Sequence, residues 1–287
     1  MVCVGGSQRL QAEFVHTAAY NVPMIWLFAY VAAGAFVGFL AGLLGIGGGM
    51  TLVPILAALF AAQSLGGDHT VHIALATAMA SAAFTSSASV REHHKHDAVD
   101  WGLVKRFVPG MVTGSLIATF ASGWVSQRTL ALSFAVIVFA AAINMLVGKK
   151  PASASALPGT AALFVLGVVI GAVSGLVSAG GTFLLMPVML YCRVTMHTAI
   201  GTGAAIGISV TAVGTLGYIA AGWRVPQLPD PHLGFVYLPA LVGLVVGSFF
   251  TAPMGARAAH RLPVATLKRV FALLMIVLAV RMAWRYF

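Results

Sequence analysis

Two stretches of the sequence combine residues that can bind an anion without any charged side chain. They read GLLGIGGGMTLVPIL (42–56) and GLVSAGGTFLLMPVM (175–189). Glycine costs about 1 kcal/mol and proline about 3 kcal/mol in a helix interior, so we predict that each stretch breaks an apolar helix. A helix that restarts after a break presents unpaired N–H groups and the positive end of its dipole, which together attract anions. The chemistry that these stretches favour is therefore anion binding.

The segment that follows each break adds hydroxyl groups. Thr77, Ser81 and Thr85 recur every four residues and so share one helix face, and Thr202 takes the place of Thr77 in the second half of the chain. Hydroxyls can donate to sulfite or sulfonate oxygens, although they also bond back to their own helix. We predict that the following residues bind substrate: Gly45, Gly47, Gly48, Gly49, Thr77, Ser81, Ser178, Gly180, Gly181, Thr182 and Thr202.

Three further residues are secondary candidates for the same site. His72 and His197 begin corresponding apolar segments, where a capping or interfacial role is the alternative. Arg91 lies at the end of the hydroxyl-bearing segment and could attract anions at the mouth of a cavity. These positions extend the site toward the ends of its helices.

The loop REHHKHDAVD (91–100) invites a metal-binding interpretation. On a helix, His93, His96, Asp97 and Asp100 would share one face. A metal site normally draws ligands from more than one segment, and the sequence offers no second cluster. We therefore predict no metal and no cofactor.

The acidic residues are placed where they could not serve as proton relays. All six fall in the first 23 residues or in predicted loops: Glu13, Asp68, Glu92, Asp97, Asp100 and Asp230. Carboxylates within a membrane are the usual proton carriers of coupled transporters. Our hypothesis is therefore an anion exporter driven by voltage and by the substrate gradient, since an anion leaving a negative-inside cell gains about 2.3 kcal/mol per charge per 100 mV.

The elements that position these residues are membrane helices. The chain has 287 residues, of which 60% are hydrophobic and 8% charged, whereas soluble domains carry about 25% charged residues. A membrane helix needs about 20 apolar residues, and the runs at 50–62 and 183–192 are too short. The apolar runs are 24–44, 50–62, 72–90, 102–124, 130–148, 158–179, 183–192, 196–222, 233–255 and 264–284. The net charge of +10 falls in the short loops between them, so we expect no nucleic-acid partner.

The chain is a tandem duplication. At an offset of 133 residues, Gly42 falls on Gly175 and Pro54 on Pro187, and at an offset of 125 residues HIALAT (72–77) resembles HTAIGT (197–202). Duplicated halves with matching broken helices indicate a transporter whose site lies between the halves. The predicted parts are a leader (1–23), repeat 1 (24–148), a linker (149–157) and repeat 2 (158–287).

The expected fold is an all-α polytopic membrane protein with two repeats of about four transmembrane helices each. Each repeat contains a broken or re-entrant helix. If the short runs also span, each repeat has five crossings and the copies are inverted. With four crossings, Lys and Arg divide ten against six, which favours both termini in the cytoplasm.

These motifs resemble the sulfite exporter TauE/SafE family, also called the toluene-sulfonate uptake permeases. The resemblance rests on the doubled Gly-rich motif with its proline, on the HIALAT segment and on VDW (99–101). It implies a multi-pass permease of the bacterial inner membrane for small sulfur-containing anions such as sulfite or organosulfonates. Ser178, Ala179 and Thr182 replace Gly45, Ile46 and Gly49 in the second copy, a departure that fits either a different substrate or drift.

The functional prediction is export of such anions. The partners implied are the small anionic substrate and the lipid bilayer, and a homo-oligomer is left open. Import of the same anions and an anion channel are the alternatives. An intramembrane enzyme is disfavoured, because the sequence contains no G-x-S-x-G, no H-E-x-x-H and no acidic pair within a span.

Overall fold

The computed structural model describes residues 23–44, 48–147, 158–226, 228–259 and 264–286. It is all-α apart from one antiparallel pair of two-residue strands, β1 (His232–Leu233) and β2 (Val236–Tyr237). The helices of the first half are α2 (Met24–Leu44), α3 (Gly49–Ala62), η1 (Gly67–His69), α4 (Thr70–Lys95), α5 (Trp101–Ala121), η2 (Ser122–Trp124) and α6 (Gln127–Val147). Those of the second half are α7 (Thr160–Leu176), α8 (Thr182–Tyr191), α9 (Met196–Gly222), α10 (Leu238–Ala259) and α11 (Val264–Tyr286).

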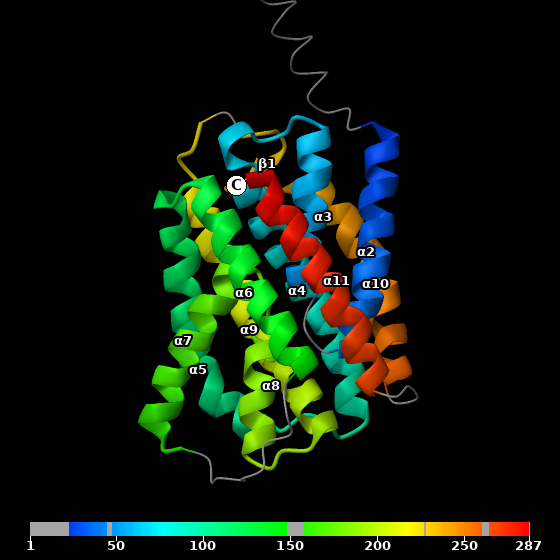
Figure 1. Ribbon diagram of the computed structural model, residues 1–287, viewed down its shortest axis with the longest axis vertical. Helices are drawn as coiled ribbons and strands as arrows, with labels where there is room; N and C mark the ends of the chain where they lie inside the picture. Colours follow the sequence, from blue (N-terminus) through cyan, green and yellow to red (C-terminus); the bar gives the residue numbers. More distant parts are fainter. Residues whose placement is uncertain (1–22, 45–47, 148–157, 227, 260–263, 287) are drawn as a thin grey trace, which may run out of the picture.

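The helices lie side by side along the long axis of the molecule (Figure 1). Five of those described are long and apolar enough to cross a membrane: α2, α4 with η1, α6, α9 and α10. Each apolar run of the sequence has a helix at its position. The prediction of an all-α, multi-pass membrane protein is confirmed.

The short runs form short helices. The 14 residues of α3 and the 10 residues of α8 rise about 21 Å and 15 Å at 1.5 Å per residue, less than the roughly 30 Å of a bilayer core. Counting them, each half contributes five α-helices to the described structure, one of them the short helix that follows the Gly-rich motif.

The two halves run in opposite directions. The first helix of the first half, α2, lies parallel to α10 and α4, and the first helix of the second half, α7, lies parallel to α5 and α9. In Figure 1, α2 accordingly starts at the top of the molecule and α7 at the bottom. The pairing also crosses between halves, since α2 packs on α10 and α7 on α5.

Glycines make these pairings close. A Cβ atom on Gly38 would lie 2.5 Å from the Cα of Ser248 on α10, and one on Gly34 would overlap the Leu244 backbone. On the other side of the molecule, Gly110 and Gly171 make the equivalent approach between α5 and α7. The prediction that glycines spaced by four residues allow helix backbones to approach is confirmed.

The directions of the helices change which basic residues we expect on the same side of the membrane. In the ten-against-six division expected from four crossings, Arg91 and Lys95 belong to the ten on one side of the membrane and Arg257 to the six on the other. In the structure, Arg257 and Lys95 both contact the same carboxylate, that of Glu92. The α4–α5 loop and the C-terminal end of α10 therefore lie at one end of the molecule, which we call the basic end.

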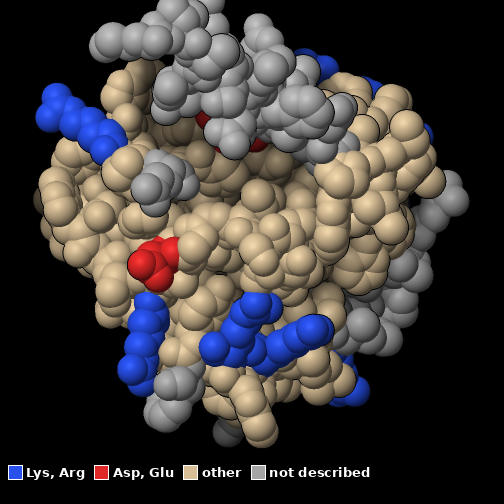
Figure 2. All heavy atoms as spheres, turned by 90° about the horizontal axis from the view of Figure 1, so that it is seen from above, with Lys and Arg blue, Asp and Glu red and all other residues tan. Residues whose placement is uncertain are grey.

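The described Lys and Arg side chains divide unequally between the two ends. The basic end carries Arg91, Lys95, Lys105, Arg106, Arg193, Arg257 and Arg269; the opposite end carries Arg128, Arg224, Arg281 and Arg285. Figure 2 shows this opposite end, where most of the visible surface is uncharged and the basic side chains gather mainly on one side. The start of α2 and the end of α11 lie at this end (Figure 1).

Candidate functional site

The first break precedes α3. Gly48 is the residue before the helix and adopts φ 73°, a left-handed conformation that favours glycine. Pro54 lies inside the short helix, and Gly48 and Gly49 are buried. Gly45 and Gly47, which we predicted as further parts of this break, lie outside the described residues.

The second break precedes α8 and repeats this conformation. Gly181 has φ 82°, and its carbonyl oxygen accepts hydrogen bonds from the N–H groups of Leu184 and Leu185. The N–H groups of Thr182 and Phe183, at the start of the helix, make no backbone hydrogen bond within the described structure. This buried helix start therefore presents free donors and a positive dipole end.

The two breaks meet in the interior of the molecule. Gly49 lies so close to the Ser178 carbonyl that a Cβ atom on Gly49 would overlap the oxygen. Ser178 itself has φ 53°, and its hydroxyl donates to the carbonyl oxygen of Leu75 on α4 at 2.7 Å. The tertiary structure thus brings together residues 129 positions apart (49 to 178) in the sequence.

Buried hydroxyls without a hydrogen-bond partner surround the second break. The Thr182 hydroxyl is one of them, although the residue is only 1% exposed. A Cβ atom on Gly203 would lie 3.0 Å from this hydroxyl oxygen, and one on Gly207 would lie 3.6 Å from the hydroxyl of Ser86 and 3.5 Å from the Cα of Gly180. Glycines on α9 therefore allow Thr182 of α8 and Ser86 of α4 to lie close against the α9 backbone.

Two more hydroxyls on α4 share this condition. Ser81 and Ser89 are 0% and 2% exposed, and neither hydroxyl has a hydrogen-bond partner in the described structure. An unsatisfied buried polar group costs about 1–3 kcal/mol, so unpartnered hydroxyls in one region call for an explanation such as a ligand. The described part of α4 thus carries three buried hydroxyls without a hydrogen-bond partner, those of Ser81, Ser86 and Ser89.

Thr77 and Thr202 have a different environment from the one that we expected. The Thr77 hydroxyl accepts a hydrogen bond from the N–H of Tyr237 at 3.0 Å, and the Thr202 hydroxyl accepts one from the N–H of Asp100 at 2.9 Å. Tyr237 immediately precedes α10, and Asp100 immediately precedes α5. Burial also raises the pKa of the Tyr237 phenol. Each threonine thus ties the start of a helix from the other half of the chain.

The secondary candidates lie away from the breaks. His72 places Nε2 3.0 Å from the Val125 carbonyl oxygen and stacks on Phe235 with ring centroids 5.0 Å apart. His197 and Arg91 are exposed at the basic end. The structure therefore does not bring the two histidines together.

Sequence reasoning missed Ser86 and Ser89, and it misplaced Glu92. The four-residue spacing from Thr77 through Ser81 and Thr85 continues to Ser89, which our prediction did not include, whereas Ser86 lies outside that spacing. Glu92, which we assigned to a loop, belongs to α4 and is 7% exposed. The prediction that every acidic residue lies in the leader or in a loop is therefore wrong, because α4 continues through REHHK to Lys95.

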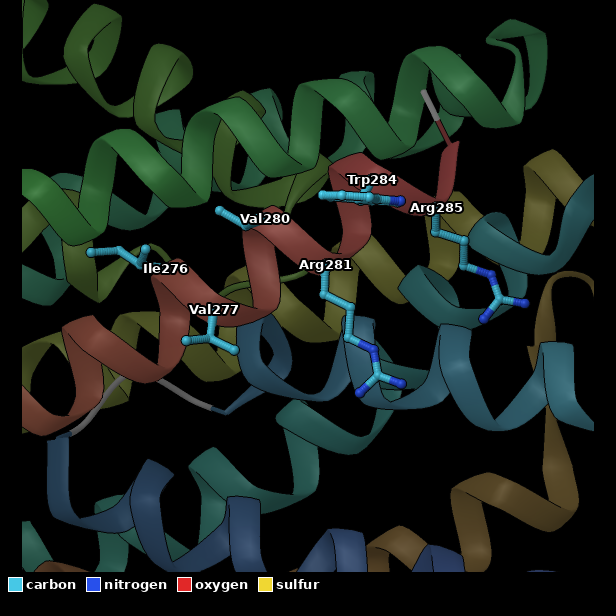
Figure 3. A pocket seen from close by; sticks show the side chains of 6 residues that line it. All are labelled: Ile276, Val277, Val280, Arg281, Trp284 and Arg285. Atoms are coloured by element: carbon cyan, nitrogen blue, oxygen red, sulfur yellow. The ribbon is translucent and has the colours of Figure 1, made fainter.

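One groove on the surface has a cavity volume of about 680 Å³. Its lining comes from α11 alone: Ile276, Val277, Val280, Arg281, Trp284 and Arg285 (Figure 3). The lining includes none of the break residues, so we do not assign substrate to it. No group of three or more His, Cys, Asp or Glu side chains could hold a metal ion in the part of the chain that the structure describes.

Comparison with known proteins agrees with this architecture. The family model described as "Sulfite exporter TauE/SafE" matches residues 30–282. A "Probable membrane transporter protein" of Haemophilus influenzae is 34% identical over 250 residues, covering 87% of this chain and 95% of that protein.

More distant relatives carry similar names. A "Probable membrane transporter protein" of Xylella fastidiosa is 26% identical over 90% of this chain and 95% of its own, and YunE of Bacillus subtilis is 22% identical over 88% and 96%. No solved structure matches the chain. The family model spans nearly every described helix and the relatives are named as membrane transporters, so the chain belongs to the TauE/SafE sulfite exporter family of membrane transporters.

Proposed function

We propose that this transporter exports small sulfur-containing anions, such as sulfite or organosulfonates, and binds them where the two breaks meet. The observation that carries the proposal is the buried, unpartnered Thr182 hydroxyl at the free start of α8, with the Ser86 hydroxyl across a glycine surface from it. The substrate class and the direction rest on the family description. The site lies between inverted halves, as in other transporters with broken helices.

The donors at this site suit an oxyanion. Two N–H groups at a helix start and two hydroxyls can each donate to an anion oxygen, and the nearby glycines allow close approach of the backbone. The interior carries no cation near the break among the described residues, so the substrate's charge is balanced by dipoles. Because the site is buried, substrate reaches it only when the helices around α8 separate.

Flux into proteoliposomes tests this proposal. We would compare sulfite, thiosulfate, sulfate, taurine, sulfoacetate and toluene sulfonate with the wild-type protein and with Ser86→Ala and Thr182→Val. Each substitution removes a donor to a charged ligand, worth about 1.5–3 kcal/mol, so the KM for the transported anion should rise roughly 10- to 100-fold.

Matched controls are available for both substitutions. Ser87 is the neighbour of Ser86 and bonds to the Ala83 carbonyl oxygen of its own helix at 2.7 Å, and Thr113 is exposed and bonds to Pro109 in the same way. Ser87→Ala and Thr113→Val should transport like the wild-type protein. Wild-type kinetics in both Ser86→Ala and Thr182→Val would refute the site, and flux in the inward direction alone would favour the importer.

A further inference from the structure

A buried carboxylate lies between two cations at the basic end of α4. The Arg257 Nε is 3.1 Å from Glu92 Oε1, and the Lys95 Nζ is 3.3 Å from Glu92 Oε2. The Glu92 side chain is 9% exposed, whereas those of Arg257 and Lys95 are 63% and 66% exposed. The acid is therefore enclosed, and its two cations face outward.

The polar residues of α4 connect this carboxylate to the proposed substrate site. Ser89 lies three residues from Glu92 and three from Ser86, so the three side chains follow one another along the same side of the helix. Ser86 and Ser89 are both buried with unpartnered hydroxyls. This row of side chains runs from the α8 break to the basic end.

Glu92, Lys95 and Arg257 favour an anion only when their three charges are taken together. One carboxylate and two cations leave one net positive charge. The carboxylate occupies donors of the kind that a sulfite or sulfonate group would use, because guanidinium and ammonium groups bind carboxylates and other oxyanions alike.

We infer that Arg257, beside Lys95, forms an outer binding site for the transported oxyanion, and that the Glu92 carboxylate occupies Arg257 until the substrate replaces it there. Lys95 stays with Glu92 during the exchange, so the buried carboxylate is not left unpaired. This inference rests on the proposed function. It adds a second site, for a small oxyanion with at least two free oxygens, at the end of the row of α4 hydroxyls.

A structural ion pair would give a different pattern of variants. If the pair only holds α4 to α10, removing either partner lowers stability, and transport falls with the amount of folded protein. If Glu92 competes with substrate, removing its charge improves substrate binding, while removing the Arg257 charge weakens it.

The experiment measures KM and kcat for sulfite flux in proteoliposomes, together with thermal stability in detergent. Glu92→Gln should lower KM about two- to tenfold, and Arg257→Gln should raise it by a similar factor, the scale expected for one charge at a partly exposed site. The variant that carries both Glu92→Gln and Arg257→Gln should have a KM between those of the single variants, since it keeps the Lys95 charge. Lys105→Gln, which removes an exposed cation at the same end on α5, is the control and should leave KM unchanged.

The readings separate this inference from the proposed function. If the wild-type protein transports sulfite but Arg257→Gln and Lys105→Gln have the same KM, the outer site alone is overturned. An increased KM in Glu92→Gln would also overturn it. Absence of wild-type flux with every anion tested would overturn both proposals. Arg257→Lys, which keeps the charge, should retain a KM close to that of the wild type even if Arg257→Gln is unstable.

Discussion

At the scale of residues, threonines that the sequence predicts for one site have different hydrogen-bonding environments. Thr182 has a buried hydroxyl without a partner, whereas Thr77 and Thr202 each accept a hydrogen bond from a backbone N–H. A buried N–H that loses its acceptor costs about 1–3 kcal/mol. Opposite effects on stability and transport should therefore distinguish these threonines.

The first prediction concerns the two paired threonines. Thr77→Val and Thr202→Val should each lower the free energy of unfolding by about 1–3 kcal/mol, because the Tyr237 or Asp100 N–H is left unsatisfied. The KM of the protein that remains folded should stay within about twofold of the wild-type value. Thermal unfolding in detergent and proteoliposome flux would check both statements, with Thr113→Val as the matched control. A variant with wild-type stability and a large rise in KM would instead move that threonine into the substrate site.

At the scale of elements, the breaks depend on backbone conformations that glycine allows. Gly48 and Gly181 occupy the same position before a short helix, with φ 73° and 82°. Left-handed backbone costs other residues roughly 1–2 kcal/mol. The breaks are therefore specified by the conformation of single residues as well as by weak helix propensity.

The second prediction tests this conformation. Gly181→Ala should lower the free energy of unfolding by at least about 1 kcal/mol, and the new Cβ atom would also meet the Met111 side chain. Gly159→Ala is the control, because Gly159 precedes α7 with φ −61° and has no heavy atom within 4 Å of the added Cβ position. Thermal unfolding of the two variants gives the comparison; equal stability would show that the positive φ is not needed.

At the scale of the whole molecule, the helix directions lead us to predict a membrane orientation opposite to the one expected from four crossings. Among described side chains, seven Lys and Arg lie at the basic end and four at the other. Cytoplasmic ends carry the excess of positive charge. The basic end should then face the cytoplasm, with the start of α2 and the end of α11 on the outside, opposite to the arrangement inferred from four crossings.

The third prediction follows from this orientation. In intact cells, Arg224→Cys should react with a membrane-impermeant maleimide, whereas Lys105→Cys should react only after permeabilisation, with Cys3 and Cys192 first replaced by serine. Arg224 lies after α9 at the end opposite the basic end, and Lys105 is exposed on α5 at the basic end. The reverse labelling pattern would support cytoplasmic termini.

The sequence by itself determined which segments are helices and which of them are short. Apolar run length and the local cost of glycine and proline act within a few residues, so the positions of α3 and α8 could be predicted without a structure. The glycine spacing similarly predicted close helix packing. The family follows from the same motifs.

Only the tertiary structure decided what these segments meet. Whether Ser86 or Thr77 faces the α8 break depends on the rotation of α4 against α9, and the Glu92–Arg257 contact joins residues 165 positions apart. The inversion of the halves depends on whether two short helices count as separate segments, which hydropathy does not resolve. Such long-range choices are set by the packing of whole helices, and packing sums many weak contacts that no local stretch of sequence contains.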